Sequence, residues 1–408
     1  MTLYEELKWR GLIKDVTSPE LENKLNNEKL TFYIGTDPTA DSMHIGHYSS
    51  FLIAKRLAKA GHKPLLLIGG ATGRIGDPRP TTEREMKSIE EIEKNTKNLK
   101  KQAEEIFGFE VVDNYDWIKN INIIEFLRDY GKYFNINYML DKDIIRRRLE
   151  TGITFTEFSY MLLQSLDFLH LHETRGVNLQ VAGSDQWGNI TSGVDLIRKK
   201  LGDEVYAFTM PLILDQNGKK FGKSEGNALW LDKNKTSSYE LYQYLINTDD
   251  SMIESYLKVF TFLSPEEIMD IVSKHNNEPH LRLGQKTLAR EIITDLHGKE
   301  EYEKAVQISE NLFSGNIKEI NVNDLMIGLK DVPHFILKDE SLLDLLVNNN
   351  ICSSKREARE FLGNNAISVN GEIINDENKF IDKTKTIEGK IVVIRRGKKK
   401  YYVGLVEE

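Results

Sequence analysis

Hydrophobic positions in the first half of the chain alternate between short apolar runs and longer amphipathic stretches. The run 31–36 predicts a strand, the stretch 47–60 has apolar residues at helical spacing, and the continuous apolar run 64–70 predicts a buried parallel strand. The alternation continues through a charged helix 82–107, helices 121–130 and 155–173, a strand 177–183 and a helix ending at residue 200. The pattern predicts a Rossmann-type, doubly wound α/β domain with a parallel sheet over residues 1–235.

The second half of the chain shows a different pattern. Residues 236–325 have helical periodicity and almost no β-rich runs, which predicts a helical domain. The pattern weakens around Gly328 and Pro333, so we expect a linker over residues 326–340. Beyond it, Ser354 and Glu357 have the spacing of a capping box, and Asn370-Gly371 separates two alternating runs as in a hairpin. Residues 341–408 are therefore expected to form a small α+β domain.

Composition places the chain among ordinary globular proteins. It has 408 residues, 40% of them apolar and 29% charged, which excludes collagen-like and largely disordered classes. The net charge of −8 gives no sign of a nucleic-acid partner. The charge is unevenly distributed, because residues 341–408 hold 12 Lys and Arg against 10 Asp and Glu, so this segment carries +2 and the rest −10. A local basic surface is compatible with the acidic total.

Cysteine usage and hydropathy bear on the cellular compartment. Cys352 is the single cysteine, so neither an intrachain disulfide nor a thiolate metal cluster can form. The N-terminus has no apolar signal region, and no stretch has the roughly 18 apolar residues that a membrane span requires. We therefore expect a cytoplasmic protein that does not associate with membranes.

A polar segment follows the first predicted strand, at the edge where parallel sheets open to ligands. His44 and His47 lie three residues apart at the start of the next helix, with Gly46 between them. Glycine lets a planar group approach the backbone, and a helix N-terminus favours anions, so a phosphate could dock here. The alternatives are a chance spacing or a metal pair, but neither a His-Glu-x-x-His motif nor a third ligand cluster accompanies the histidines.

A second segment, 219–227, is rich in lysine and glycine and follows a predicted strand. A mobile loop of this kind could bring the ammonium groups of Lys220 and Lys223 to a polyphosphate. The alternative is a solvated run of charge, which is what most lysine-rich loops are. The chain has no Gly-x4-Gly-Lys-Ser/Thr signature, which argues against a kinase or GTPase.

Together, His44-Ile45-Gly46-His47 and Lys220-Phe221-Gly222-Lys223-Ser224 resemble, in order and separation, the two signatures of class I aminoacyl-tRNA synthetases. Four further blocks, 33–39, 69–73, 160–167 and 183–189, are similar to those of bacterial-type tyrosyl-tRNA synthetases. The resemblance covers essentially the whole chain, including a C-terminal segment similar to the S4 RNA-binding domain. It implies an enzyme that activates L-tyrosine with ATP, releases pyrophosphate and transfers the tyrosyl group to the 3′ end of tRNA(Tyr).

The same resemblance implies a tyrosine pocket. Tyr33 and Asp167 match the pair that holds the phenolic hydroxyl, and such polar groups would be left unpaired if phenylalanine entered. The resemblance implies that the substrate ammonium contacts Asp77, Tyr160 and Gln164. It also implies that Gln186 lies near the substrate carboxylate and that Asp37 lies near both substrates. By spacing alone, Tyr160, Gln164 and Asp167 would be the polar edge of an ordinary helix, Tyr33 would be core, and Asp77 would be a cap or turn residue.

For the ATP side, the resemblance implies catalysis by positioning and by groups that bind the pentacoordinate phosphate, without a protein nucleophile. The groups expected to do so are Thr39, His44, His47, Lys220 and Lys223. The ATP-binding residues are expected to be Gly35, His44, Gly46, His47, Gly183, Asp185, Lys220, Lys223 and Ser224, with Gly183 and Asp185 at the ribose. Magnesium is expected to accompany ATP on its phosphate oxygens, and no protein-bound structural metal is expected.

Two positions depart from the commoner pattern of these enzymes. Many relatives carry a Ser-x-Lys stretch after the Gly-Asp-Pro block, whereas this chain has Arg79 and Arg84 in that region, and either arginine could replace the lysine at pyrophosphate. Ile34 occupies a place where some relatives have a cysteine that reaches the ribose, and isoleucine cannot make that hydrogen bond. We expect activity to be retained with an altered ATP affinity.

Contacts to tRNA and to a second subunit follow from the resemblance as well. Arg198 and Lys199 are similar to the region that contacts the acceptor stem, and the S4-like segment supplies cations for phosphates. These cations are Lys355 and Arg356, followed by Arg359, Arg395, Arg396, Lys398, Lys399 and Lys400, of which the last five could equally be a solvated basic tail. The resemblance also implies a homodimer, with Phe155 and Phe158 as candidate interface residues; their alternative role is buried core.

Three other functions are alternatives to this interpretation. A tryptophanyl-tRNA synthetase is disfavoured by the pair Tyr33 and Asp167. A non-catalytic RNA-binding relative would not need His44, His47 and both lysines of the loop together. A small nucleotidyltransferase shares the His-Ile-Gly-His element but should lack the two appended RNA-binding regions.

Overall fold

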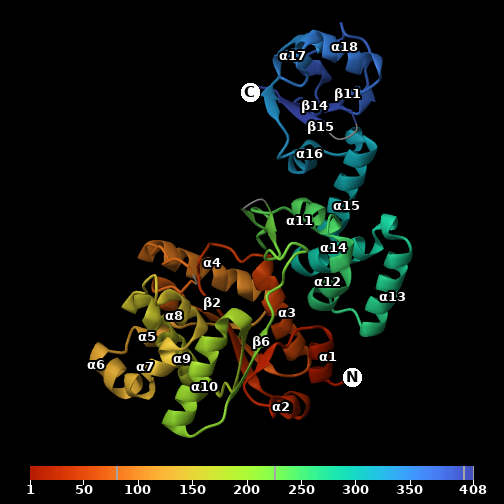
Figure 1. Cartoon of the computed structure of the whole chain (residues 1–408). Coiled ribbons are helices and arrows are strands. Elements are labelled where there is room, and N and C mark those ends of the chain that lie inside the picture. The colour runs from red at the N-terminus through yellow and green to blue at the C-terminus, as the bar shows by residue number, and fades with distance from the viewer. Residues whose placement is uncertain (80, 225–226, 398–399, 408) are drawn as a thin grey trace. The chain divides into compact units, whose positions relative to one another are not determined.

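A computed structural model of the chain divides it into two compact units (Figure 1). It describes all residues except 80, 225–226, 398–399 and 408, and only the backbone of residues 223, 224 and 227. The first unit comprises Met1–Thr236 and Thr248–Glu291, and the second comprises Ser237–Asn247 and Ile292–Glu408. The domain boundaries expected near residues 235, 325 and 340 stay predictions.

Within the described residues, the first unit is built on a six-stranded sheet in the order β1, β6, β5, β2, β3, β4. All neighbours pair in parallel except β1, which joins the edge antiparallel to β6. The strands are β1 (Asp15–Val16), β2 (Thr31–Thr36), β3 (Lys63–Ile68), β4 (Glu110–Asp113), β5 (Leu179–Gly183) and β6 (Tyr206–Met210). The order reverses between β2 and β5, which confirms the expected doubly wound fold and marks the edge where such sheets bind ligands.

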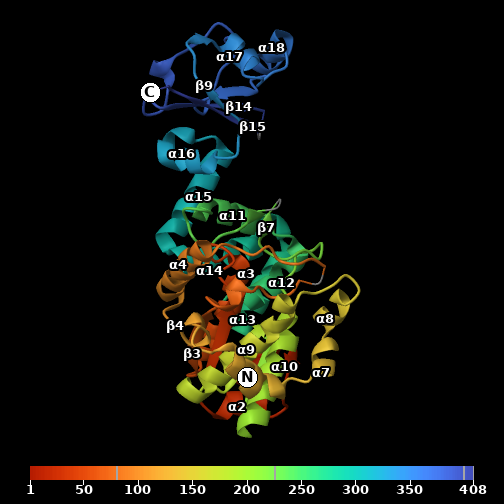
Figure 2. The same cartoon turned by 90° about the vertical axis from the view of Figure 1, so that its left-hand side faces the viewer.

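Helices cover the sheet of the first unit. The helix α3 packs on β3, α4 packs on β3 and β4, and α10 packs on β5 and β6 with α9 beside it (Figures 1 and 2). The helices from the N-terminus to α8 are α1 (Leu3–Trp9), α2 (Leu21–Asn27), α3 (Ile45–Lys59), α4 (Ile89–Phe107), α5 (Tyr115–Ile118), α6 (Ile123–Glu125), α7 (Ile136–Leu140) and α8 (Asp143–Arg148). They are followed by α9 (Phe155–Arg175), α10 (Trp187–Leu201), α12 (Ile253–Phe260) and α13 (Pro265–Asn277). A short hairpin of β7 (Lys223–Ser224) and β8 (Asn227–Ala228) precedes α12.

One helix begins later than the sequence pattern predicted. The expected helix 82–107 starts at Ile89, where the Ser88 side chain caps it by accepting from the Glu91 backbone amide. Residues before Ser88 belong to a loop, and the carbonyl of Thr82 is bound by Arg148 from another part of the chain. The helical expectation for 82–88 was therefore wrong, because Ser88 caps the helix and Arg148 binds the Thr82 carbonyl in the segment before it.

The second unit is a helical stem followed by a small sheet domain. Its helices are α11 (Ser238–Ile246), α15 (Lys299–Ser314), α16 (Val322–Gly328), α17 (Leu342–Asn348) and α18 (Lys355–Gly363), and α14 (Leu283–His297) contributes its C-terminal residues. The described residues form a five-stranded sheet in the order β12 (Glu372–Ile373), β11 (Ile367–Val369), β14 (Ile391–Arg396), β15 (Lys400–Leu405) and β9 (His334–Ile336). The strands β10 (Glu340–Ser341) and β13 (Phe380–Ile381) form a separate pair. This arrangement agrees with the expected small α+β domain.

The segment 326–340 is not the plain linker that the sequence suggested. It contains the end of α16 and the strand β9, which pairs in parallel with β15 through His334, Phe335 and Ile336. Short-range periodicity could not reveal this strand, because its pairing partner lies about 70 residues further along the chain. In the described part of the chain, no helix is long and apolar enough to cross a membrane.

Candidate active site

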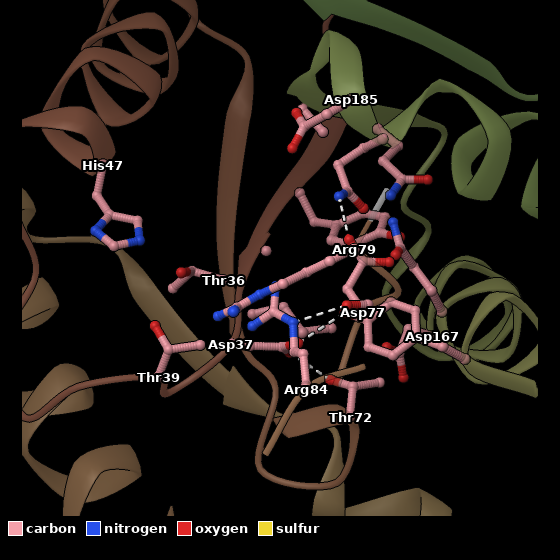
Figure 3. A pocket seen from close by; sticks show the side chains of 18 residues that line it. Thr36, Asp37, Thr39, His47, Thr72, Asp77, Arg79, Arg84, Asp167 and Asp185 are labelled. Atoms are coloured by element: carbon pink, nitrogen blue, oxygen red, sulfur yellow. Dashed lines mark hydrogen bonds between the residues drawn. The ribbon is translucent and has the colours of Figure 1, made fainter. Parts of the chain in front are cut away.

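A cavity of about 340 Å³ lies at the carboxyl ends of β2 and β5, where the strand order reverses. The structure brings eleven of the predicted site residues to its wall (Figure 3): Tyr33, Gly35, Asp37, Thr39, His47, Asp77, Tyr160, Gln164, Asp167, Asp185 and Gln186. A second cavity of about 310 Å³ shares His47 and is lined by the predicted residues His44, Gly46, Gly183 and Lys220. Residues far apart in the sequence are therefore collected at one edge of the sheet.

Asp167 on α9 forms one side of the main cavity and is almost completely buried. Asn114 Nδ2 donates to its Oδ2 at 2.9 Å, and Trp117 Nε1 donates to its Oδ1 at 3.0 Å. Burial, together with the nearby carboxylates Asp37 and Asp113, raises the pKa of Asp167 to about 8 against the lowering effect of these two donors. The site thus contains a carboxyl group that can form a hydrogen bond with a hydroxyl group of a ligand.

Tyr33 on β2 lies beside this carboxyl group. Its side chain is 2% exposed, and its hydroxyl has no hydrogen-bond partner among the described residues. Burial, and then the charge of Asp167, raise the pKa of the phenol well above its usual value, so it remains a neutral donor. An unpaired buried hydroxyl is costly, which suits a site that a ligand hydroxyl completes.

Asp37 follows β2 and anchors the centre of the cavity. Thr72 Oγ1 donates to its Oδ1 at 2.7 Å, and Tyr160 Oη donates to its Oδ2 at 2.8 Å. Gly69 makes this contact possible, because a Cβ at that position would lie 2.0 Å from the Asp37 carboxylate oxygen. Burial raises the pKa of Asp37 despite both donors.

Asp77 lines the same cavity as Asp37 and Asp167 (Figure 3) and adds a third carboxyl group to it. Gln186 Nε2 donates to its Oδ2 at 2.8 Å, and Asn189 Nδ2 donates to its Oδ1 at 3.1 Å. Burial raises the pKa of Asp77 to about 6. Three crowded carboxyl groups with raised pKa values are typical of a site that receives a cation.

The two histidines of the first motif contact each other at the start of α3. Their ring centroids are 3.9 Å apart, the Gly46 backbone amide donates to His44 Nδ1 at 3.0 Å, and the His44 amide donates to His47 Nδ1 at 3.1 Å. Both Nδ1 atoms thus accept, which places the proton of each neutral ring on Nε2. Burial, together with His44, lowers the pKa of His47 to about 3.

The sequence suggested that Gly46 lets a planar group approach the backbone. In the structure a Cβ on Gly46 would lie 2.8 Å from the His44 ring, so the glycine also leaves room for that imidazole. By contrast, a Cβ on Gly35 would find ordinary van der Waals contacts with Leu67. The local packing therefore requires a glycine at position 46 and not at position 35.

The lysine-rich loop docks on this first motif. The Leu229 amide donates to the Gly222 carbonyl at 3.0 Å, and the Ile45 amide donates to the Leu229 carbonyl at 2.9 Å. Gly222 has φ +83°, and a Cβ there would lie 1.8 Å from Ile45 Cγ2. Phe221 packs against Tyr256 of α12, with ring centroids 4.6 Å apart. The two predicted motifs are thus joined through backbone hydrogen bonds and close packing.

Within this loop, Lys220 is exposed and lines the second cavity. The side chains of Lys223 and Ser224, both predicted to bind ATP, lie outside the described residues, as do Lys398 and Lys399 entirely. The region following Asp77 places Arg79 and Arg84 in the main cavity, as their sequence position suggested. Arg84 Nε donates to the Asp77 carbonyl at 2.7 Å.

The predicted RNA-contacting residues lie outside both cavities. Arg198 and Lys199 are exposed on α10 and pair with Asp195 at 2.5 and 2.6 Å. In the second unit, Lys355 and Arg356 are exposed at the start of α18, and Lys355 pairs with Asp344 at 2.7 Å. Exposed ion pairs contribute little to stability, so these cations are available for phosphates.

Several residues of the cavity were not identified from the sequence. Asn114 and Trp117 hold Asp167, Thr72 holds Asp37, and the fully buried Asn114 also donates to Thr72 Oγ1 at 3.0 Å. Asn114 directly follows β4, at the carboxyl edge of the sheet, and that position was the signal that could have revealed it. No comparable signal marks Gln180, which is buried in β5 and also lines the cavity.

Comparisons with known proteins agree on one family. Residues 25–314 match the family described as tRNA synthetases class I (W and Y), and residues 324–404 match the tyrosine–tRNA ligase SYY-like C-terminal domain. The chain is 49% identical to a tyrosine–tRNA ligase of Listeria monocytogenes (99% of each chain) and 50% identical to one of Macrococcus caseolyticus (98% of each). A crystal structure of a C-terminally truncated mitochondrial tyrosyl-tRNA synthetase of Aspergillus nidulans superposes with a TM-score of 0.67 at 34% identity, over 76% of this chain and 94% of that one.

Proposed function

The chain belongs to the class I tRNA synthetases for tryptophan and tyrosine, and we propose that the cavity between Asp37, Asp77 and Asp167 is the active site of its tyrosine–tRNA ligase activity. The ligase joins tyrosine to tRNA, and as a class I synthetase it uses ATP. The observation that carries the proposal is the pair formed by Tyr33, whose buried hydroxyl lacks a partner among the residues that the structure describes, and the buried carboxyl group of Asp167. Tryptophan has no hydroxyl to satisfy such a pair.

We propose that tyrosine lies with its phenol between Tyr33 and Asp167 and its ammonium group among Asp77, Tyr160 and Gln164. The raised pKa values of Asp77 and Asp37 support this orientation, because a bound ammonium would compensate the buried negative charge. Gln186, which is held against Asp77, then lies near the substrate carboxylate. Asp37 lies between the amino acid and the nucleotide.

We propose that ATP occupies the space shared by the two cavities, with Gly183 and Asp185 at its ribose and Gly35 beside it. A carboxylate oxygen of tyrosine attacks the α-phosphorus, the bond to the β-phosphate oxygen breaks, and pyrophosphate leaves. His44 and His47 donate from Nε2 as neutral groups, because their Nδ1 atoms already accept backbone hydrogen bonds. Thr39, Lys220, Lys223 and Ser224 are proposed to complete the phosphate-binding set.

Magnesium is proposed to arrive with ATP. Among the described residues, no group of three His, Cys, Asp or Glu side chains could hold a metal ion by itself. The carboxylates of Asp37 and Asp77 already accept hydrogen bonds from Thr72, Tyr160 and Gln186, so we propose that the ion is held mainly by phosphate oxygens. When bound, it would neutralise charge on the polyphosphate.

We propose that Arg198, Lys199, Lys355 and Arg356 bind tRNA phosphates, and that the enzyme acts in the cytoplasm. Their exposure supports contact with a large polyanion. The single cysteine, Cys352, is buried and free, which suits a reducing compartment.

A homodimer is proposed from an exposed apolar surface of the first unit. Phe155 is 73% exposed rather than buried core, while Phe158 is half-buried against Met161 and its neighbours. Other apolar residues exposed in the segment that precedes α9 are Ile123, Ile124, Leu127, Ile136 and Leu149. Such a concentration of exposed apolar side chains is typical of a surface that another subunit covers.

The direct test of the proposed site is ATP–pyrophosphate exchange with tyrosine, tryptophan and phenylalanine offered separately to the wild type and to Asp167→Ala. We expect exchange with tyrosine alone, and in the variant a loss of tyrosine exchange that is far larger than the loss of thermal stability. Equal exchange with tyrosine and phenylalanine would refute the assignment of the pair Tyr33 and Asp167 to the phenol.

A further inference from the structure

The loop between Asp77 and α4 carries Arg79 and Arg84 into an acidic cavity. Figure 3 shows both side chains reaching toward the centre of the pocket, on the side that faces Thr39 and His47. Among the described lining residues they are the only permanent cations, whereas four carboxyl groups line the same wall, those of Asp37, Asp77, Asp167 and Asp185. A polyphosphate can enter such a cavity only if cations are held in place to receive it.

This loop is held from behind by Arg148 of α8, a buried arginine that does not line the cavity. Its Nη1 donates to the carbonyl of Arg79 at 2.9 Å and to the carbonyl of Thr82 at 3.1 Å. Its Nε donates to the carbonyl of Gly152 at 3.1 Å, and its side chain is 4% exposed. One guanidinium thus binds two carbonyls of the loop and the turn that follows α8.

Glu157 of α9 completes the arrangement. Arg148 Nη2 donates to its Oε2 at 2.8 Å, and the Arg84 backbone amide donates to its Oε1 at 3.4 Å. Glu157 lies in the first turn of α9, whose N-cap Thr154 accepts from the Glu157 amide. A carboxylate at a helix N-terminus is favoured, and it compensates the buried guanidinium. The pair therefore fixes the loop at both ends of its arginine-bearing stretch.

We infer that Arg148 and Glu157 are positioning residues that hold Arg79 and Arg84 at the polyphosphate of ATP. The inference rests on the proposed function of the cavity and extends it to side chains that do not touch either substrate. A buried ion pair is a poor source of stability, because desolvation offsets its attraction. Its value here lies in geometry, since one planar guanidinium binds the loop carbonyls through Nη1, Glu157 through Nη2 and Gly152 through Nε. The single nitrogen of a lysine cannot make these three sets of contacts at once.

The decisive variant is Arg148→Lys. It keeps the positive charge beside Glu157 and loses the guanidinium hydrogen bonds to the carbonyls of Arg79 and Thr82. We expect kcat/KM for ATP in pyrophosphate exchange to fall roughly 10- to 100-fold, because small misplacements of charged groups are costly in catalysis. The dissociation constant of tyrosine should change by less than about twofold, since the tyrosine contacts are untouched. Arg147→Lys is the matched control, because Arg147 is its exposed neighbour on α8 and pairs with Asp143.

A double-variant cycle with Arg79→Gln and Arg84→Gln separates positioning from packing. If Arg148 acts through these arginines, adding Arg148→Lys to Arg79→Gln/Arg84→Gln should cost less than about twofold further. Any of three results would overturn the inference. These are an additive loss of kcat/KM for ATP in the combined variant, an equal loss of tyrosine and ATP binding in Arg148→Lys, and wild-type kinetics of Arg148→Lys. Wild-type exchange by Arg79→Gln/Arg84→Gln would instead refute the proposed role of these arginines at polyphosphate.

A second measurement covers the case in which Arg148→Lys folds poorly. In Glu157→Gln, one acceptor oxygen of the pair becomes an amide donor, while the shape of the side chain is kept. We expect faster hydrogen exchange at the amides of residues 81–84, together with the same selective loss in kcat/KM for ATP. Unchanged exchange at these amides, with unchanged kinetics, would contradict the inference.

Discussion

Replacing Tyr33 with phenylalanine should have opposite effects on folding and on substrate binding. The Tyr33 hydroxyl is buried at the carboxyl edge of β2 and has no hydrogen-bond partner among the described residues. In the ligand-free protein it therefore contributes a desolvation cost and no compensating hydrogen bond. In the complex it should bind the phenolic oxygen of tyrosine. Few positions in a folded core combine these two properties.

The magnitudes follow from this geometry. A buried hydroxyl without a partner costs about 1–3 kcal/mol, and the gap left by one oxygen offsets part of the gain, so the free energy of unfolding should rise by about 1 kcal/mol. A neutral hydrogen bond contributes about 0.5–1.5 kcal/mol, so tyrosine should bind about two- to tenfold more weakly. Discrimination against phenylalanine should fall by a similar factor, since phenylalanine never makes that bond.

Urea denaturation of the ligand-free variant measures the first effect, and equilibrium dialysis with tyrosine measures the second. Exchange kinetics with tyrosine and phenylalanine give the change in discrimination. Tyr206→Phe is the matched control, because its hydroxyl donates to Glu204 and Glu20 away from the cavity, and it should leave tyrosine binding unchanged. A fall of more than about 1 kcal/mol in the unfolding free energy of Tyr33→Phe, or unchanged tyrosine affinity, would refute the reasoning.

Three other predictions concern the same unit. Tyrosine binding, measured by equilibrium dialysis, should weaken as the pH falls through about 6, the raised pKa of Asp77, and Asp77→Asn should lose this dependence. Because folding raises that pKa, the titration should also stabilise the ligand-free protein in urea as the pH falls from 7 toward 5; a flat profile would contradict the pKa assignment. Gly222→Ala should reduce kcat for exchange at least about tenfold with tyrosine affinity retained, because its Cβ would meet Ile45 at 1.8 Å; normal kcat would show that the loop works undocked. Phe155→Glu should shift the sedimentation coefficient to that of a monomer, and an unaltered coefficient would place the subunit contact elsewhere.

Much of the fold could be predicted from local patterns. The buried run in β3 and the helix α3 that follows β2 are strong short-range signals, because burial on both faces and helical periodicity are visible within a dozen residues. The strand β9 could not be predicted in this way, because it pairs with the distant strand β15. The start of α4 has a local signal, the cap Ser88, that the helical periodicity of the preceding residues did not reveal.

The residues of the candidate site also fall into those that a local pattern reveals and those that depend on contacts between distant segments. His44, His47 and the lysine-rich loop were identifiable because their chemistry lies in short contiguous motifs. Tyr33, Asp77 and the polar residues of α9 had ordinary structural interpretations. They and Asp37 became site candidates through the family resemblance alone. Asn114, Trp117 and the pair of Arg148 and Glu157 had no motif, because their roles consist of contacts with residues about 50 or more positions away or across a turn.

The sequence by itself determined the alternation of strands and helices, the two signature motifs and the family, because these properties depend on residues that are close together in the sequence. Only the tertiary structure decided which polar groups are buried together and which lack a partner. Three properties depend on removal from water, which is a property of the packed fold. They are the pKa of Asp167, the Tyr33 hydroxyl that has no partner among the described residues, and the hydrogen bonds from the buried Arg148 to the loop.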